Sequence, residues 1–68
     1  MSRENFVIKL SDAKTSEAVY VNPSHIVHIK PVKDGTEIGT VLETVVVKET
    51  VEQIQRKGGQ YAIFKIVD

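Results

Sequence analysis

Two histidines and a set of carboxylates are the side chains of this sequence that could do chemistry. His25 and His28 are the only imidazoles, and a metal site would need both on one face with a third ligand nearby. The spacing predicts His25 in a turn and His28 at the start of a strand, which separates them, and no third ligand lies near them in the sequence. We interpret both as surface or half-buried histidines and expect no metal and no cofactor.

Four glutamates could in principle form an acid–base pair. Such a pair needs two environments that drive the pKa values of its members apart, and nothing in the sequence indicates a pocket that would do so. Solvated charges on a small domain are the simpler interpretation. One of them directly precedes a predicted helix, where its charge would favour the helix dipole. The four are Glu37, Glu43, Glu49 (the one before the helix) and Glu52.

No nucleophile motif is present. The serines lack a G-x-S-x-G context, and the chain has no cysteine. Gly58-Gly59 follows a predicted helix, whereas a phosphate-binding loop opens one. We therefore expect that the protein is not an enzyme and that it has no catalytic residues.

Lysines on predicted strands are the remaining candidates for a binding site. Lys30, Lys33 and Lys48 could contact a nucleic-acid backbone from one face of a sheet. Sheet faces that bind nucleic acid usually carry aromatic side chains between the basic ones. The chain also has no excess of positive charge, because 9 Lys and Arg balance 9 Asp and Glu. Lysines that protect exposed sheet edges are the simpler interpretation. A small nucleic-acid-binding regulator, or a regulatory protein of the phage or plasmid type, stays as the alternative function.

The size of the chain limits its interior. The sequence has 68 residues and is predicted to form one domain, residues 1–68. A domain of this size buries only about 60% of the surface that its unfolded chain exposes. The absence of cysteine excludes disulfides and thiolate zinc sites as sources of stability. Self-association, which buries more surface, is the remaining source.

Targeting and membrane segments are not expected. Residues 2–5 are polar and include Arg3 and Glu4, and Lys9 and Asp12 interrupt the apolar run that follows. A membrane span needs roughly 20 apolar residues. We expect a cytoplasmic protein that does not insert into a membrane.

The first half of the chain predicts three strands. Residues 5–10 and 17–22 alternate in hydropathy and are joined by the polar loop 11–16, which indicates an antiparallel hairpin. Asn22-Pro23 is typical of the start of one helical turn. Residues 27–32 form the third predicted strand, with Val27 and Ile29 expected on one face.

The second half predicts two more strands and a helix. Asp34-Gly35 marks a turn, followed by strands over residues 36–41 and 44–48. The connection at 41–44 lacks turn residues, so a hairpin and a single bent strand both stay open.

A short helix is expected over residues 51–57. Thr50 and Gln53 match a capping box, Val51 and Ile54 share a face, and Gly58-Gly59 provides a left-handed exit.

The last stretch, residues 60–67, is strand-like and apolar on both faces. Such a strand lies in the centre of a sheet or is buried against something else, which in so short a chain includes a second copy. The candidate interface residues are Tyr61, Ile63, Phe64 and Ile66. The predicted fold class is α+β and mostly β: a bent antiparallel sheet or small barrel of five to six strands with one short helix.

Three segments resemble a known family. Residues 19–23 combine an aromatic with Asn-Pro, residues 25–29 are rich in Ile, and residues 45–54 end in Glu-Thr-Val-Glu-Gln-Ile. Together, over residues 8–54, they resemble the FlbD/SwrD family of small bacterial flagellar and swarming-motility proteins, although the Asn-Gly of that family's hairpin has no counterpart at 41–44. The resemblance implies a non-enzymatic motility accessory that acts through protein contacts. We therefore expect a non-catalytic interaction module that works as a homo-oligomer and touches other proteins.

Overall fold

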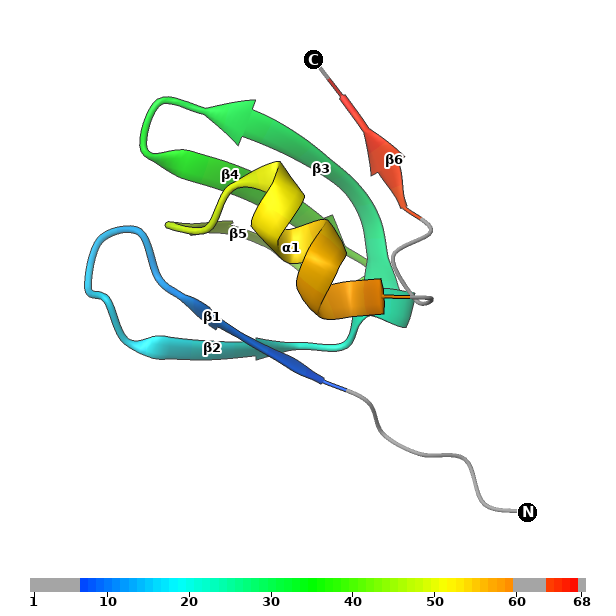
Figure 1. Cartoon of the computed structure of the whole chain (residues 1–68), viewed down its shortest axis with the longest axis horizontal. Helices are drawn as coiled ribbons and strands as arrows, with labels where there is room; N and C mark the ends of the chain where they lie inside the picture. Colours follow the sequence, from blue (N-terminus) through cyan, green and yellow to red (C-terminus); the bar gives the residue numbers. More distant parts are fainter. Residues whose placement is uncertain (1–6, 60–63, 68) are drawn as a thin grey trace.

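The computed structural model describes residues 7–59 and 64–67. Its strands outweigh its single α-helix, which confirms the α+β, mostly β class. The elements, shown in Figure 1, are β1 (Ile8–Ser11), β2 (Ala18–Val21), a 3-10 turn η1 (Pro23–His25), β3 (Ile26–Val32), β4 (Gly35–Thr40), β5 (Thr44–Val47), α1 (Val51–Gly58) and β6 (Lys65–Ile66).

The strands form two sheets that do not close into a barrel. One sheet contains β1 and β2, and the other has the order β5-β4-β3-β6. The prediction of an all-antiparallel sheet is wrong for β6, which runs parallel to β3 with Ile66 opposite Ile29. The reason is the position of α1 between β5 and β6, because a crossover helix returns the chain to the sheet in the parallel direction.

The first hairpin forms as predicted. β1 pairs antiparallel with β2, with Leu10 opposite Val19. Ile8 and Leu10 are buried while Lys9 between them is exposed, as a period of two requires. In the connecting loop the Asp12 carboxylate accepts the backbone N–H groups of Lys14 and Thr15. The polar loop thus satisfies its own backbone, as its composition predicts.

A β-bulge in β3 overturns one prediction about faces. The register against β4 shifts between Ile26 and His28, so the chain gains one unpaired residue there. Val27 is consequently 55% exposed, whereas Ile26 and Ile29 both point into the core. Val27 and Ile29 therefore do not share a face. The turn before the bulge forms as expected, since the Asn22 side chain accepts the N–H of Ser24 at 2.8 Å.

The connection between β4 and β5 is a hairpin and not a bent strand. β4 and β5 pair antiparallel from Thr36–Val47 to Gly39–Thr44. The hydroxyl of Thr40 makes the side-chain to backbone hydrogen bonds that Asn or Asp often makes in such a turn. It accepts the N–H of Glu43 at 3.0 Å and donates to the carbonyl of the same residue at 2.9 Å.

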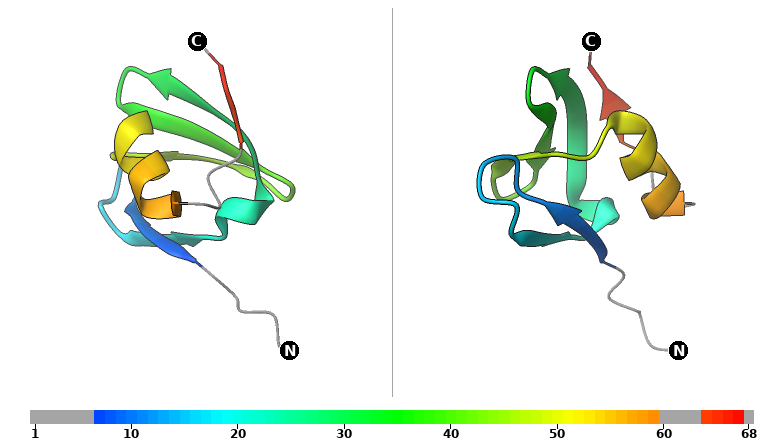
Figure 2. Two further views of the ribbon diagram at one scale, coloured as in Figure 1. Left: turned by 45° about the vertical axis from the view of Figure 1, so that its right-hand side comes forward. Right: turned by 60° about the vertical axis from the view of Figure 1, so that its left-hand side comes forward.

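Backbone hydrogen bonds at one corner join the two sheets. Ala13 N–H donates to the carbonyl of Val46 at 3.0 Å, and Lys48 N–H donates to the carbonyl of Ser11 at 2.8 Å. Both views of Figure 2 show the β1–β2 hairpin at one end of the larger sheet, with α1 beside them. The helix contacts both β1 and β3, so it covers the opening between the two sheets.

The helix begins and ends close to the predicted residues. Thr50 and Gln53 form both bonds of a capping box, and Gly59, with a φ of 56°, ends the helix. Ile54 is fully buried, while its neighbours Glu52 and Gln53 are exposed. In the described part of the chain, the apolar core consists of eight side chains: Ile8, Leu10, Val21, Ile26, Ile29, Ile38, Val47 and Ile54.

Candidate interaction surface

A groove between the β1–β2 hairpin and the β4–β5 turn carries the most exposed apolar side chains of the described chain. We call it the hairpin groove; it has a volume of about 130 Å³ and is lined by residues 19–22, His25, residues 40–43 and Val45. Within it Leu42 is 88% exposed, Val41 65% and Tyr20 62%. Single exposed apolar side chains are ordinary on protein surfaces, but several around one groove are typical of an interaction site.

Local structure holds the two walls of the groove in place. The alternation of β2 places Val19 and Val21 toward the core and leaves Tyr20 outside. The opposite wall is the β4–β5 turn, and Val41 N–H donates to the carbonyl of His25 at 3.0 Å. Because this bond ties the turn to η1, Leu42 at its tip is held in solvent next to the groove.

The groove was not among the sites predicted from the sequence. Leu42 and Val41 fall in the segment whose conformation the sequence leaves open, and the sequence predicts for Tyr20 only a place in the strand over residues 17–22. The signal that could have indicated the site is an apolar Val-Leu pair at the tip of a hairpin, where polar residues are usual. Only the pairing of β4 with β5 places that pair opposite Tyr20.

The predicted interface at the C-terminal end is described only in part. Tyr61 and Ile63 lie outside the described residues. Phe64 is half-buried and packs against the core, and Ile66 is 42% exposed on β6. β6 lies at the edge of its sheet, so of the two predicted alternatives the central position is excluded for residues 65–66. Parallel pairing with β3 covers one edge of β6. The opposite edge of β6 is only two residues long, which is too short to pair with another strand.

The three lysines predicted as nucleic-acid contacts lie in different surroundings. Lys30 is exposed on β3 opposite Glu37 of β4, and Lys33 lies in the β3–β4 turn. Lys48 follows β5, and its ammonium group donates to the hydroxyl of Ser16. The charge of Glu37 beside Lys30 reduces the positive potential of that face.

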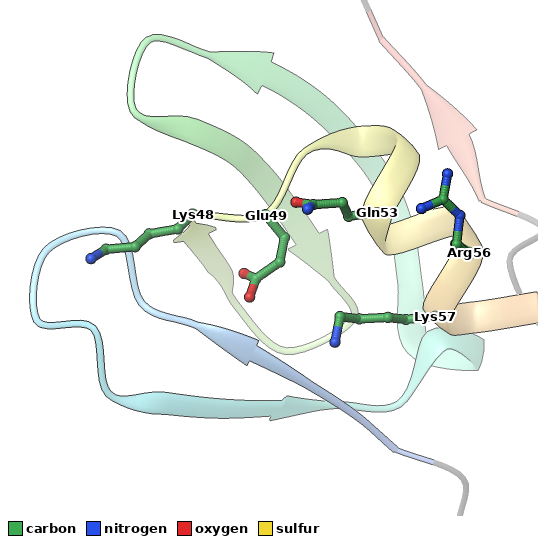
Figure 3. A pocket seen from close by; sticks show the side chains of 5 residues that line it. All are labelled: Lys48, Glu49, Gln53, Arg56 and Lys57. Atoms are coloured by element: carbon green, nitrogen blue, oxygen red, sulfur yellow. The ribbon is translucent and has the colours of Figure 1, made fainter.

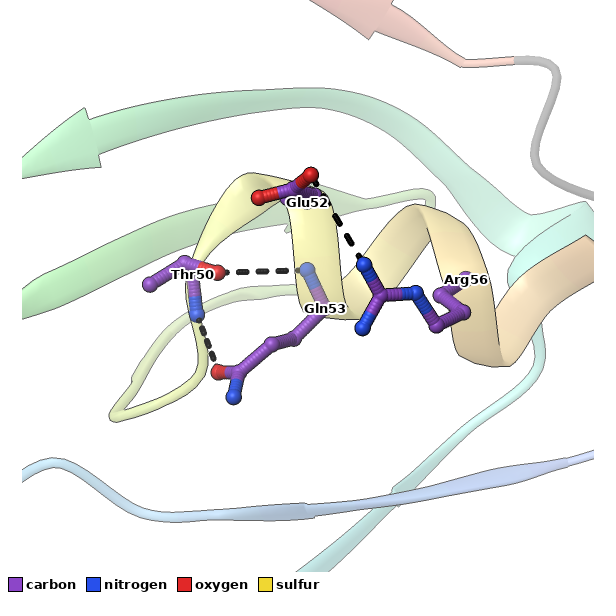
Figure 4. Close-up of polar contacts among 4 residues, drawn as sticks. All are labelled: Thr50, Glu52, Gln53 and Arg56. Atoms are coloured by element: carbon purple, nitrogen blue, oxygen red, sulfur yellow. Dashed lines mark hydrogen bonds and ion pairs between the residues drawn. The ribbon is translucent and has the colours of Figure 1, made fainter.

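Lys48 lies instead with two basic residues of the helix. These three line a basic groove of about 480 Å³ together with Glu49 and Gln53. Figure 3 shows the Glu49 carboxylate between the Lys48 and Lys57 side chains, while Arg56 points away. Arg56 is 3.7 Å from Glu52 one turn earlier, as Figure 4 shows beside the capping box. Arg56 is therefore paired with a carboxylate, and Glu49 adds a negative charge to the lining, which together weaken this groove as an anion site.

The histidines and carboxylates do not form a metal cluster within residues 7–59 and 64–67. His25 belongs to η1, while His28 lies on the outer face of β3 with Nε2 3.9 Å from an oxygen of Glu37. The ring of His28 covers Gly39, where a Cβ would collide with it. The absence of a side chain at Gly39 thus provides the space for the ring.

Glu49 has a structural role that the sequence did not indicate. Its Oε1 accepts the backbone N–H of Ser11 at 2.9 Å, and its carbonyl accepts the hydroxyl of the buried Thr36 at 2.7 Å. Glu49 therefore fastens β1 and β4 to the start of α1, in addition to any effect on the helix dipole.

Comparisons with protein-family models, with curated proteins and with solved structures found no match. Across the described ranges, no helix is long and apolar enough to cross a bilayer.

Proposed function

We propose that this protein is a small, non-catalytic interaction module that works as a homo-oligomer. The observation that carries the proposal is the exposure of Leu42, Val41 and Tyr20 around one groove. Removing apolar area from water contributes about 25 cal/mol per Å², so a patch of this kind favours association. Tyr20 belongs to β2, and the β4–β5 turn that carries Val41 and Leu42 is held by the bond from Val41 N–H to the carbonyl of His25. Burial of the three side chains would therefore need little reordering of the backbone.

The small interior is the reason to expect a second copy as partner. Eight apolar side chains form the core of the described chain, and neither disulfides nor a metal cluster supplements it there. Association would bury surface that one copy leaves in water, and most soluble oligomers are built from identical chains.

The resemblance of residues 8–54 to the FlbD/SwrD family suggests the cellular setting. On this basis the module would be a cytoplasmic accessory of bacterial motility. The shared motifs form the turn at Asn22-Pro23 and the cap at Thr50, which are local structural features. They support a common fold more than a common binding site, so the partner in the cell has to be found by capture from the native host.

Sedimentation velocity of the full chain over a wide concentration range tests the oligomer. We expect a species of at least twice the 7.6 kDa monomer at high concentration, which dissociates on dilution. Leu42→Ser should weaken this species, whereas Val7→Ser, which removes a half-exposed apolar side chain away from the groove, should not. A chain that sediments as a monomer at every concentration would refute the proposal.

A second candidate function is binding of nucleic acid at the basic groove. Lys48, Arg56 and Lys57 line this groove from two elements. If they neutralise phosphates, affinity for a labelled oligonucleotide should fall steeply with added salt and should weaken in Lys57→Glu. No binding at low salt would eliminate this alternative.

A further inference from the structure

Within residues 7–59 and 64–67, the backbone of β2 has one edge without a neighbouring strand. Hydrogen-bonded and non-bonded residue pairs alternate along an antiparallel ladder. Asp12 N–H donates to the carbonyl of Glu17 at 2.8 Å, which makes the next pair, Ser11–Ala18, a non-bonded one. Ala18 and Tyr20 therefore direct their N–H and C=O groups away from β1.

The bonds of Ser11 support this assignment independently. Ser11 donates its N–H to Glu49 Oε1 and accepts from Lys48 N–H with its carbonyl, both on the side of β1 that faces away from β2. Its opposite residue in the ladder, Ala18, must then point the other way. β2 has no second strand in its sheet, and in Figure 1 it lies at the border of the molecule with no strand beyond it.

This edge lacks the usual protection. Exposed edges commonly carry Lys, Pro or a bulge that prevents pairing with another chain. The sequence of β2 is Ala-Val-Tyr-Val, with neither charge nor proline. By contrast, the outer edge of β5 is partly covered by residues 11–13, and β6 carries Lys65.

We propose that β2 pairs antiparallel with β2 of a second copy, centred on Val19, to make a continuous four-stranded sheet across two molecules. In this register Ala18 of each copy lies opposite Tyr20 of the other. Each of these residues offers one donor and one acceptor, so the pairing forms four backbone hydrogen bonds. The inference rests on the proposed function and adds to it the surface and the geometry of the contact.

Two features favour a second copy over an unrelated peptide, and a third favours any strand added at this edge. The edge is self-complementary, as a two-fold interface requires, because its donors and acceptors match themselves when reversed. The antiparallel register also places the two Glu17 side chains at opposite ends of the pair, so their charges do not meet. Finally, β2 is one wall of the hairpin groove, so a strand laid along it would approach Val41 and Leu42 on the other wall.

Amide hydrogen exchange of the unmodified chain tests the geometry directly. In one copy the amides of Ala18 and Tyr20 have no partner in β1, while the amide of Val19 is bonded to β1 and serves as the internal control. We expect protection of Ala18 and Tyr20 to rise with protein concentration in step with the oligomer, while Val19 is protected throughout. Fast exchange of both edge amides in a solution of oligomers would overturn the inference.

A pair of substitutions at Ala18 provides the second test. Ala18→Pro removes the outward N–H without breaking a bond to β1, whereas Ala18→Val keeps the N–H in a residue that favours strands. The dissociation constant should rise about tenfold or more in the proline variant, because each copy loses a donor, and should change little in the valine variant.

The outcomes separate the two proposals. A monomer at every concentration would refute the oligomer and this contact together. An oligomer that Ala18→Pro leaves intact, with fast exchange at Tyr20, would refute only the β2 pairing and would leave the proposed oligomer standing. If the proline variant does not fold, the exchange measurement on the unmodified chain decides.

Discussion

Removal of the Glu49 side chain should destabilise the fold more than removal of any other glutamate near the helix. In Glu49→Ala the half-buried N–H of Ser11 loses its acceptor at 2.9 Å. A polar group left without its partner in this way costs about 1–3 kcal/mol. A chain of this length has a stability on the order of 3–10 kcal/mol, so the loss is a large fraction of the total.

Two further variants distinguish this bond from a helix-dipole effect. Glu49→Gln removes the charge but keeps an oxygen that can accept from Ser11, so we expect less than half of the loss seen with alanine. Glu52→Ala removes a charge from the first turn of the helix, where the carboxylate is exposed and lies 3.7 Å from Arg56. An exposed pair of this kind contributes about 0.3–0.5 kcal/mol.

Urea denaturation followed by circular dichroism measures all three variants under one condition. The midpoint should fall most for Glu49→Ala, with the slope unchanged, and the amide of Ser11 should exchange faster. Equal losses for Glu49→Ala, Glu49→Gln and Glu52→Ala would mean that Glu49 acts only through the helix dipole. The assignment of Glu49 as the link between β1 and α1 would then be refuted.

Three other variants test the core, the outer face and the acid response. Ile54→Ala should cost about 2–5 kcal/mol by urea denaturation and Ile54→Val about 0.5–1.5, since this side chain is fully buried; equal small losses would contradict the packing of α1. Gly39→Ala should cost about 1–3 kcal/mol by displacing the His28 ring, and the loss should largely disappear in a His28→Ala background. The N–H groups of Thr15 and Lys14 lower the pKa of Asp12 below 3.8. The ionised Asp12 carboxylate therefore stabilises the fold above pH 3.8, and this contribution is lost as the pH falls through the lower pKa of the folded state. Between pH 5 and pH 2, the urea midpoint of Asp12→Asn should consequently drop less than that of the unmodified chain.

Local features of the fold could be predicted because they depend on neighbouring residues. Thr50 and Gln53 form a capping box wherever a helix begins between them, and Asn22 caps its turn through a bond spanning two residues. The alternation in residues 8–11 likewise determines which side of β1 is buried. In each case the interaction closes within one turn of chain, so its entropic cost is small and the local pattern decides.

Features that depend on pairing across the chain could not be predicted. The bulge at Val27 lets the seven residues of β3 pair with the six residues of β4, and the parallel direction of β6 follows from the path of α1. The bond from Ser11 to Glu49 joins residues 38 positions apart. No pattern along the sequence encodes such a distance, since the partner is selected by packing.

The candidate surfaces show the same difference between local features, which the sequence predicts, and features that depend on pairing across the chain. From its sequence alone, this chain determined a small β-rich fold with one capped helix and an interior limited by its length. Tertiary structure decided where the unburied residues gather: pairing of β4 with β5 carries Leu42 to the groove beside Tyr20, and the ladder of β1 with β2 selects which amides face outward. The physical reason is that hydrophobicity and strand propensity belong to single residues, whereas a free edge and a shared groove are properties of segments brought together in space.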